Sequence, residues 1–484
     1  MKSLAKNAVF NAFYKLLNLL FPLITSMYVS RILQADGIGK VSFAQTIASY
    51  FIVFATMGLP YYGMREVSRV RNNQEKLNRL FTELFLFNVV TTIVSSTAYG
   101  VIIWNVPSMR KELSLYLATG FIICLNAINI DWLYQGQEEY VYIVCRNIII
   151  KCISLIAMFF LVRNKSDYVV YAWLISFATC GNYCLNLWNA RKHVHFDFKN
   201  ICIQKHVMPL AVMAVGEMLS TLYGKLDITM LGLLKDEVSI GYYTYAFKTE
   251  ELVLSVCIAI TAILLPRLSY LYENGDSEQF VKILDKGLQV LFFLVTPAFV
   301  GIEIMAPKLV TLLYGKSFGA SAAILRVLAI LIFIKSFGDL LCFQVLVCIG
   351  EEKKRILANI TACTINIILN TTLIKSFGGI GAAIASVTSE IVCNGYLLEE
   401  VKKKISISFP QKAFFQAVLS TTVMACGVLA ASQIKCSLIL SCGIELFVGI
   451  VLYLTVNLIL KNEILGDAVF KICDKMSLFQ RRRK

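Results

Sequence analysis

Lysine side chains recur inside long apolar stretches of this sequence, where a charge is costly. A charge at the centre of a bilayer costs about 2.5–3.5 kcal/mol on insertion scales, so such residues are usually functional or paired. Five of them lie deep within apolar stretches: Lys15, Lys151, Lys225, Lys248 and Lys335. The lysine ammonium is a compact point charge suited to phosphate groups. These residues therefore predict an interior that binds an anionic ligand.

Amide side chains accompany the first of these lysines. Asn11, Lys15 and Asn18 are spaced by three or four residues, which places them on one face of a helix. We add Arg31, which follows this apolar stretch, to the candidate binding residues. Hydrogen bonding between neighbouring helices is the alternative explanation for polar residues on such a face.

Four acidic residues inside apolar stretches are candidates to bind a coupling ion: Glu217, Asp227, Asp339 and Glu390. Protonation would remove the desolvation cost of a buried carboxylate. The sequence leaves H⁺, Na⁺ and an uncoupled cycle open. Lys335 and Asp339 are four residues apart and could instead pair with each other.

Patterns for metal, disulfide or catalytic chemistry are missing from the sequence. Most of the 15 cysteines lie inside apolar stretches, where cysteine behaves as a small hydrophobe. The three histidines share one polar loop without a cysteine or acidic cluster at zinc-ligand spacing. We find no phosphate-binding P-loop and no catalytic triad spacing. We therefore expect no metal, no cofactor beyond a possible coupling ion, no catalytic residues and no enzyme activity.

The elements that must position these residues are membrane-spanning helices. Of 484 residues, 57% are hydrophobic and 16% are charged, whereas a soluble domain is about 45–50% apolar and about 25% charged. A span needs roughly 20 mostly apolar residues. The sequence predicts an all-α integral membrane protein with about fourteen spans, at 8–30, 41–63, 81–104, 113–131, 141–162, 168–190, 208–233, 244–266, 287–305, 322–349, 356–375, 380–398, 413–432 and 438–460.

The positive charge of the chain is distributed as the positive-inside rule requires. With a cytoplasmic N-terminus, the cytoplasmic segments carry 28 Lys and Arg and the external loops carry 10. This predicts that both termini are cytoplasmic and that the basic tail, Arg481 to Lys484, faces anionic lipid. The net charge of +15 therefore indicates membrane lipids as partners, and no nucleic acid.

A short pattern recurs about 200 residues apart. Ile38-Gly39-x-x-x-Phe43-Ala44 matches Ile240-Gly241-x-x-x-Tyr245-Ala246, and the helix that follows ends in Leu-Pro in both copies. Six spans separate the copies, which gives the halves the same orientation, as in parallel transporter repeats. We predict six-helix lobes at 1–195 and 196–400, with two extra helices and a basic cytoplasmic tail at 401–484.

In these features the sequence resembles the bacterial polysaccharide or O-antigen flippase family of the multidrug, oligosaccharidyl-lipid and polysaccharide exporter superfamily. The residues that carry the resemblance are Ser30 to Leu33 with Gly37-x-Gly39, Asp131-Trp132-x-x-Gln135-Gly136-x-Glu138, Asp227-x-x-Met230-Leu231-Gly232, the turn from Ile240 to Ala246 with Lys248, Leu313-Tyr314-Gly315, Gly350-Glu351 to Lys353, and Gly379-x-Gly381-Ala382-Ala383. The resemblance implies alternating access in the bacterial inner membrane. Its expected cargo is an undecaprenyl-pyrophosphate-linked oligosaccharide for surface polysaccharide synthesis, with polysaccharide polymerase machinery as a further expected partner.

Other functions stay open at this point. The closest alternatives are a cation (multidrug) exporter and a peptidoglycan-precursor flippase of the same superfamily. An excess of buried lysine disfavours a cationic cargo. A membrane polysaccharide polymerase or glycosyltransferase is a more distant alternative, because the external segments are short.

Overall fold

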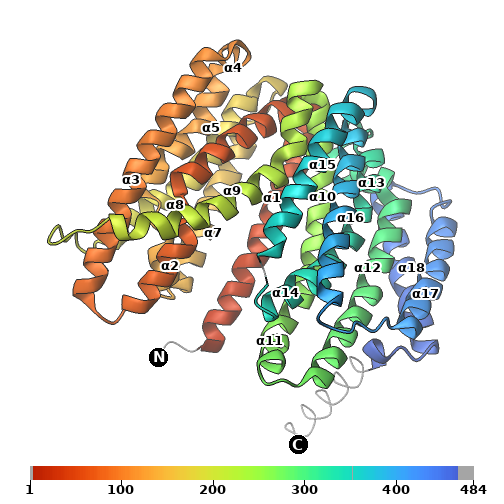
Figure 1. Cartoon of the computed structure of the whole chain (residues 1–484). Helices are drawn as coiled ribbons and strands as arrows, with labels where there is room; N and C mark the ends of the chain where they lie inside the picture. The colour runs from red at the N-terminus through yellow and green to blue at the C-terminus, as the bar shows by residue number, and fades with distance from the viewer. Residues whose placement is uncertain (1–3, 352, 467–484) are drawn as a thin grey trace, which may run out of the picture. The chain divides into compact units, whose positions relative to one another are not determined.

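The computed structural model describes residues 4–351 and 353–466, and the side chains of residues 21–351 and 353–466. Every regular element of these residues is a helix (Figure 1). The α-helices are α1 (Leu4–Thr56), α2 (Leu59–Val70), α3 (Gln74–Asn105), α4 (Pro107–Lys111), α5 (Leu113–Leu125), α6 (Asp131–Gly136), α7 (Tyr140–Leu161), α8 (Tyr168–Ala190), α9 (Gln204–Leu234), α10 (Glu237–Thr261), α11 (Leu265–Glu273), α12 (Ser277–Tyr314), α13 (Ser321–Gly338), α14 (Val345–Cys348), α15 (Lys354–Phe377), α16 (Gly379–Lys402), α17 (Gln411–Ala431) and α18 (Leu438–Ile459). Short 3-10 segments and one π-helix, Asp339–Gln344, join some of them.

The predicted all-helical membrane fold is confirmed. Among the described residues, twelve helices are long and apolar enough to cross a bilayer, and a further apolar segment, Leu113–Ile128, is shorter. The first of the twelve, Phe21–Val70, contains a break at Gln34 and therefore includes more than one helix. The count of fourteen spans stays a prediction.

Two boundaries in the first third of the chain were wrong. The expected loop at 31–40 is helical except at Gln34, whose φ of 56° and ψ of −172° separate two helices within α1. The second helix stops at Thr56, and Leu59-Pro60 begins α2 after the left-handed Gly58. Leu265-Pro266 likewise begins α11. Proline favours the first turn of a helix because it has no N–H to leave unpaired there.

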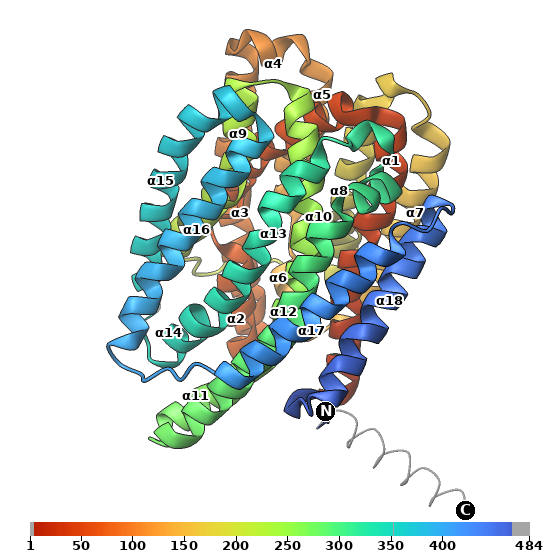
Figure 2. The same ribbon diagram turned by 90° about the vertical axis from the view of Figure 1, so that its right-hand side faces the viewer.

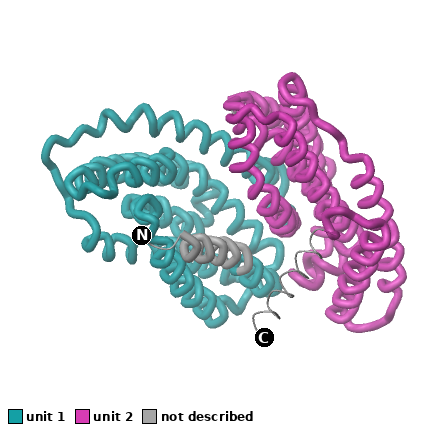
Figure 3. Tube along the Cα trace, turned by 90° about the horizontal axis from the view of Figure 1, so that it is seen from below, with its two compact units in different colours: residues 1–241 teal, residues 242–484 magenta. Residues whose placement is uncertain are grey.

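The chain divides into two compact units, residues 1–241 and 242–484 (Figure 3). The predicted division at 195 and 400 stays a prediction. In unit 1, one core joins α2, α3 and α6, where Trp132 is 2% exposed and packs closely against Gly63. That close approach leaves no space for a side chain at residue 63.

Unit 2 is a set of long helices packed side by side. Helix α13 packs against α12 and α16, and α15 packs against α16 (Figure 2). The two C-terminal helices, α17 and α18, form a hairpin that lies against α12. Their shared core contains Met305, Met424, Val428, Cys442 and Tyr453.

Candidate binding and coupling site

Charged side chains of unit 2 gather halfway along its helices. Glu250 lies near the middle of the 25-residue helix α10, and Glu390 near the middle of the 24-residue helix α16. Lys335 lies near the middle of the apolar segment Ser321–Cys348. With Asp339 and Asn394 they form what we call the mid-helix cluster.

The basic member of the mid-helix cluster is Lys335. Its Nζ lies 3.8 Å from a carboxylate oxygen of Glu250, and the side chain is 23% exposed. The ammonium also lies 5.5 Å from the ring centre of Phe247, within cation–π range. Lys335 thus carries a charge at mid-helix depth that remains partly accessible to a ligand.

A π-helix shapes the acidic side of the cluster. π-Helices are rare and often occur at functional sites. The π turn brings residues five apart together, and the Gln344 amide donates to the Asp339 carboxylate over 2.9 Å. Lys335 and Asp339 therefore do not pair with each other as the spacing suggested. Lys335 instead lies near Glu250, and Asp339 accepts a hydrogen bond from Gln344.

Helix α16 completes the cluster. The Asn394 amide donates to the Glu390 carboxylate over 3.0 Å. A Cβ on Gly338 would lie 1.9 Å from the Asn394 amide oxygen. Gly338 is therefore the residue that lets α16 approach the start of the π-helix.

The remaining predicted residues are placed separately. Arg31 is exposed on α1 and donates to the carbonyl of Met27. Lys151 of α7 lies 5.5 Å from the ring centre of Phe21. Lys248 is exposed on α10, with its ammonium 5.1 Å from the Tyr245 ring centre.

Helix α9 carries three further candidates. Glu217, Lys225 and Asp227 are all half-buried on it. One carboxylate oxygen of Glu217 is buried without a hydrogen-bond partner. The side chains of Asn11, Lys15 and Asn18 lie outside the described residues. The assignment of all these residues to a binding site stays a prediction.

Sequence reasoning missed Glu250 as a site candidate, although it is the most buried member of the cluster. Its side chain is 0% exposed. A signal was present in the helical spacing, because Tyr243, Ala246, Glu250, Leu254 and Cys257 follow each other at three or four residues and are all buried. Glu250 therefore occupies the packed face of α10, whereas its neighbour in sequence, Glu251, is exposed.

Two buried polar networks in unit 1 were also missed. Arg146 of α7 pairs with Asp131 over 3.0 Å and contacts Asn186 of α8. Glu83 of α3 is fully buried and lies 3.0 Å from the His206 Nε2. Each network joins helices that are distant in the sequence, so we interpret both as structural.

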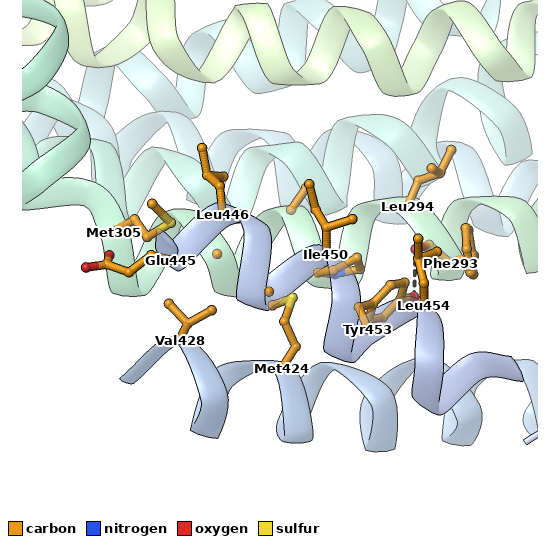
Figure 4. Close-up of a pocket in the computed structure, with 14 residues that line it drawn as sticks. Phe293, Leu294, Met305, Met424, Val428, Glu445, Leu446, Ile450, Tyr453 and Leu454 are labelled. Carbon is orange, nitrogen blue, oxygen red and sulfur yellow. Dashed lines mark hydrogen bonds between the residues drawn. The ribbon is translucent and has the colours of Figure 1, made fainter. Parts of the chain in front are cut away.

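An apolar cavity of about 300 Å³ lies between α12, α17 and α18 (Figure 4). Figure 4 shows Glu445 near Met305, and Tyr453 near Phe293, whose carbonyl accepts the Tyr453 hydroxyl over 2.7 Å. Apart from Glu445 the side chains around it are mainly aliphatic or aromatic. This lining suits a hydrocarbon chain and does not suit an anionic group.

Comparison with solved structures shows which known fold this chain is similar to. The fold is similar to that of a solved structure described as "Lipid II flippase MurJ, inward closed conformation", with a TM-score of 0.72 and 16% identity over 96% of this chain and 100% of that one. The chain thus shares its fold with that solved structure.

Sequence comparison defines the family. The model of the family described as "Polysaccharide biosynthesis protein" matches residues 4–272, and the chain belongs to this family. It is 22% identical to the "Putative O-antigen transporter" of Escherichia coli (strain K12), over 83% of this chain and 97% of that protein. It is 24% identical to the "Probable low-salt glycan biosynthesis flippase Agl15" of Haloferax volcanii, over 49% of this chain and 50% of that protein.

Proposed function

We propose that this protein is a flippase that moves undecaprenyl-diphosphate-linked oligosaccharide repeat units from the inner to the outer leaflet of the bacterial inner membrane. The observation that carries the proposal is Lys335, a partly exposed cation halfway along a membrane helix. A diphosphate is the anion that such a site would hold, because the lysine ammonium is a common phosphate ligand. The names of the relatives, an O-antigen transporter and a glycan flippase, support the same class of cargo.

The transport cycle that we propose is alternating access. The diphosphate would engage Lys225, Lys248 and Lys335, together with the other predicted basic and amide residues. Glu217, Asp227, Asp339 and Glu390 remain our candidates for binding H⁺ or Na⁺ in the return step. Both termini would be cytoplasmic, and the cargo would pass to polysaccharide polymerase machinery at the outer leaflet.

The test is translocation of a fluorescent polyprenyl-diphosphate oligosaccharide in vesicles that contain the purified protein. Loss of a hydrogen bond to a charged group costs about 1.5–3 kcal/mol, so Lys225→Ala, Lys248→Ala and Lys335→Met should each slow translocation by roughly 10- to 100-fold. Lys412→Met is the matched control, because Lys412 is 71% exposed and pairs with Glu463 at the end of the hairpin.

Each alternative gives a different result in the same vesicles. Efflux of cationic drugs without movement of any polyprenyl lipid would identify a cation exporter. Movement of only the peptide-bearing lipid precursor of peptidoglycan would identify a precursor flippase. Lengthening of the glycan would identify a polymerase or glycosyltransferase. Any of these results would refute the proposed function.

A further inference from the structure

Glu250 is a buried carboxylate with weak compensation. Its side chain is 0% exposed, and neither carboxylate oxygen has a hydrogen-bond partner. The nearest cation among the described side chains, the Lys335 Nζ, lies 3.8 Å away. A hydrogen-bonded ion pair of this type is shorter, about 2.7–2.9 Å. The charge of Glu250 therefore depends on Lys335 without a hydrogen bond to fix the pair.

The other charged groups around Glu250 increase this dependence. The groups that interact with it electrostatically are Lys335 from α13, Glu390 from α16 and Glu251 from its own helix. Two of these three carry the same charge as Glu250. Among the described side chains, Lys335 alone therefore compensates this buried carboxylate, whose oxygens have no hydrogen-bond partner there.

An anion that binds Lys335 would compete with Glu250 for the same charge. A diphosphate on the partly exposed ammonium would leave Glu250 beside more negative charge and with less compensation. A buried carboxylate in that position is strongly disfavoured as an ion, and neutralisation is the usual outcome. The ion that neutralises Glu250 must bind where no other described group hydrogen-bonds to the carboxylate.

We propose that Glu250 is a proton-binding site that takes up one proton from solvent when an anionic diphosphate engages Lys335. This proposal rests on the proposed function, because it requires a diphosphate at Lys335. A bound metal cation needs several oxygen ligands, and no group of three or more His, Cys, Asp or Glu at metal-binding spacing occurs among the described residues. A proton needs only the carboxylate.

Proton uptake has a measurable consequence for binding. Coupling between two ligands is reciprocal, so uptake of one proton makes diphosphate affinity fall tenfold for each unit rise in pH. The proton also offsets one negative charge of the incoming diphosphate. Substrate binding and proton binding would thus be one event at two adjacent side chains.

The experiment is calorimetric titration of the purified protein with farnesyl diphosphate, a soluble isoprenyl diphosphate, in sodium-free solution. Titration in two buffers of different ionisation enthalpy gives the number of protons taken up. The pH is kept between about 7.5 and 9, above the second ionisation of a phosphate. We expect wild type to take up close to one proton, and Glu250→Gln to bind the probe with no uptake and no dependence on pH. Glu237→Gln, which changes an exposed carboxylate in the first turn of the same helix, should behave as wild type.

Lys335→Met provides a second variant. We expect it to bind the probe at least tenfold more weakly and to take up no proton. Probe binding by wild type without proton uptake, or full uptake by Glu250→Gln, would overturn the proton site and leave the proposed function standing. Binding that requires added Na⁺ and takes up no proton would overturn it in favour of sodium. Failure of wild type to bind the probe would overturn the proposed diphosphate site, and the proton site with it.

Discussion

The attachment of the C-terminal hairpin to α12 should depend on one ion pair whose carboxylate is buried. The Lys308 ammonium of α12 contacts the Glu445 carboxylate of α18, lies 2.9 Å from the Ser441 hydroxyl and 3.2 Å from the Ser432 carbonyl. Glu445 is 1% exposed. Removing one partner of a buried pair costs about 3–5 kcal/mol, because the other charge stays buried. The Ser441 hydroxyl still donates to Glu445 over 2.8 Å, so we expect about 3 kcal/mol for Lys308→Met.

Cys442 reports the opening of this hairpin. Its thiol is buried in the core that α12 shares with the hairpin, and it is 2% exposed. A thiol reagent should label it only when the hairpin opens locally. At about 1.4 kcal/mol for each factor of ten, Lys308→Met should increase the labelling rate of Cys442 by roughly 100-fold, measured on its peptide by mass spectrometry.

Two further variants make this prediction refutable. Lys308→Met combined with Glu445→Leu removes both charges beside the apolar cavity, and replacing a buried pair in this way is neutral or stabilising. Lys412→Met breaks the exposed pair with Glu463, 3.2 Å apart, which should contribute no more than about 1 kcal/mol. Equal labelling in wild type and Lys308→Met, or a double variant that is labelled as fast as the single one, would refute the reasoning.

Three other predictions concern the backbone and the surface. A Cβ on Gly39 would lie 1.7 Å from the backbone oxygen of Glu237, so Gly39→Ala should lower the stability of the protein by about 1–3 kcal/mol or more. Gly443→Ala should be tolerated, because a Cβ on Gly443 would have nothing within 4 Å. Thermal unfolding of the two variants compares these effects. Gln34 has φ 56° and ψ −172°, a conformation that favours glycine, so Gln34→Gly should raise the unfolding temperature, and a lower temperature would contradict the strain. Two lysine partners hold the pKa of the Glu351 carboxyl below its ordinary value of 4.5, so its stabilisation is complete above that pH and is lost as pH falls through the lowered value. Wild type and Glu351→Gln should therefore differ in unfolding temperature at neutral pH and converge as the pH falls below the lowered pKa of Glu351.

Much of the helical fold could be predicted from the sequence because a bilayer imposes a length on every span. The predicted range 168–190 coincides with α8, and 438–460 differs from α18 by one residue. One error lies where helical structure continues through a polar segment. Residues 31–40 are polar enough to suggest a loop, but the helix on each side of Gln34 satisfies its own backbone hydrogen bonds.

The candidate site was less predictable because its contacts join distant helices. The lysine at 335 could be singled out from its apolar surroundings, but its partner is 85 residues away on another helix. The spacing of four to Asp339 suggested a local pair, and the π-helix redirected that carboxylate to Gln344. A helical-wheel analysis would have placed Glu250 on the buried face, whereas the π turn left no signal that we recognise in the sequence.

The repeat accounts for a contact within unit 1 that composition does not explain. A Cβ on Gly39 would strike the backbone of Glu237, and a Cβ on Gly241 would lie 2.0 Å from the backbone oxygen of Ala35. Gly39 and Gly241 are equivalent in the repeat, and so are Ala35 and Glu237, because each pair is separated by 202 residues. The two copies thus exchange the same contact, which is the signature of a local two-fold axis. A side chain at either glycine would push apart two backbone segments that lie in contact, so packing excludes a side chain at this position in both copies.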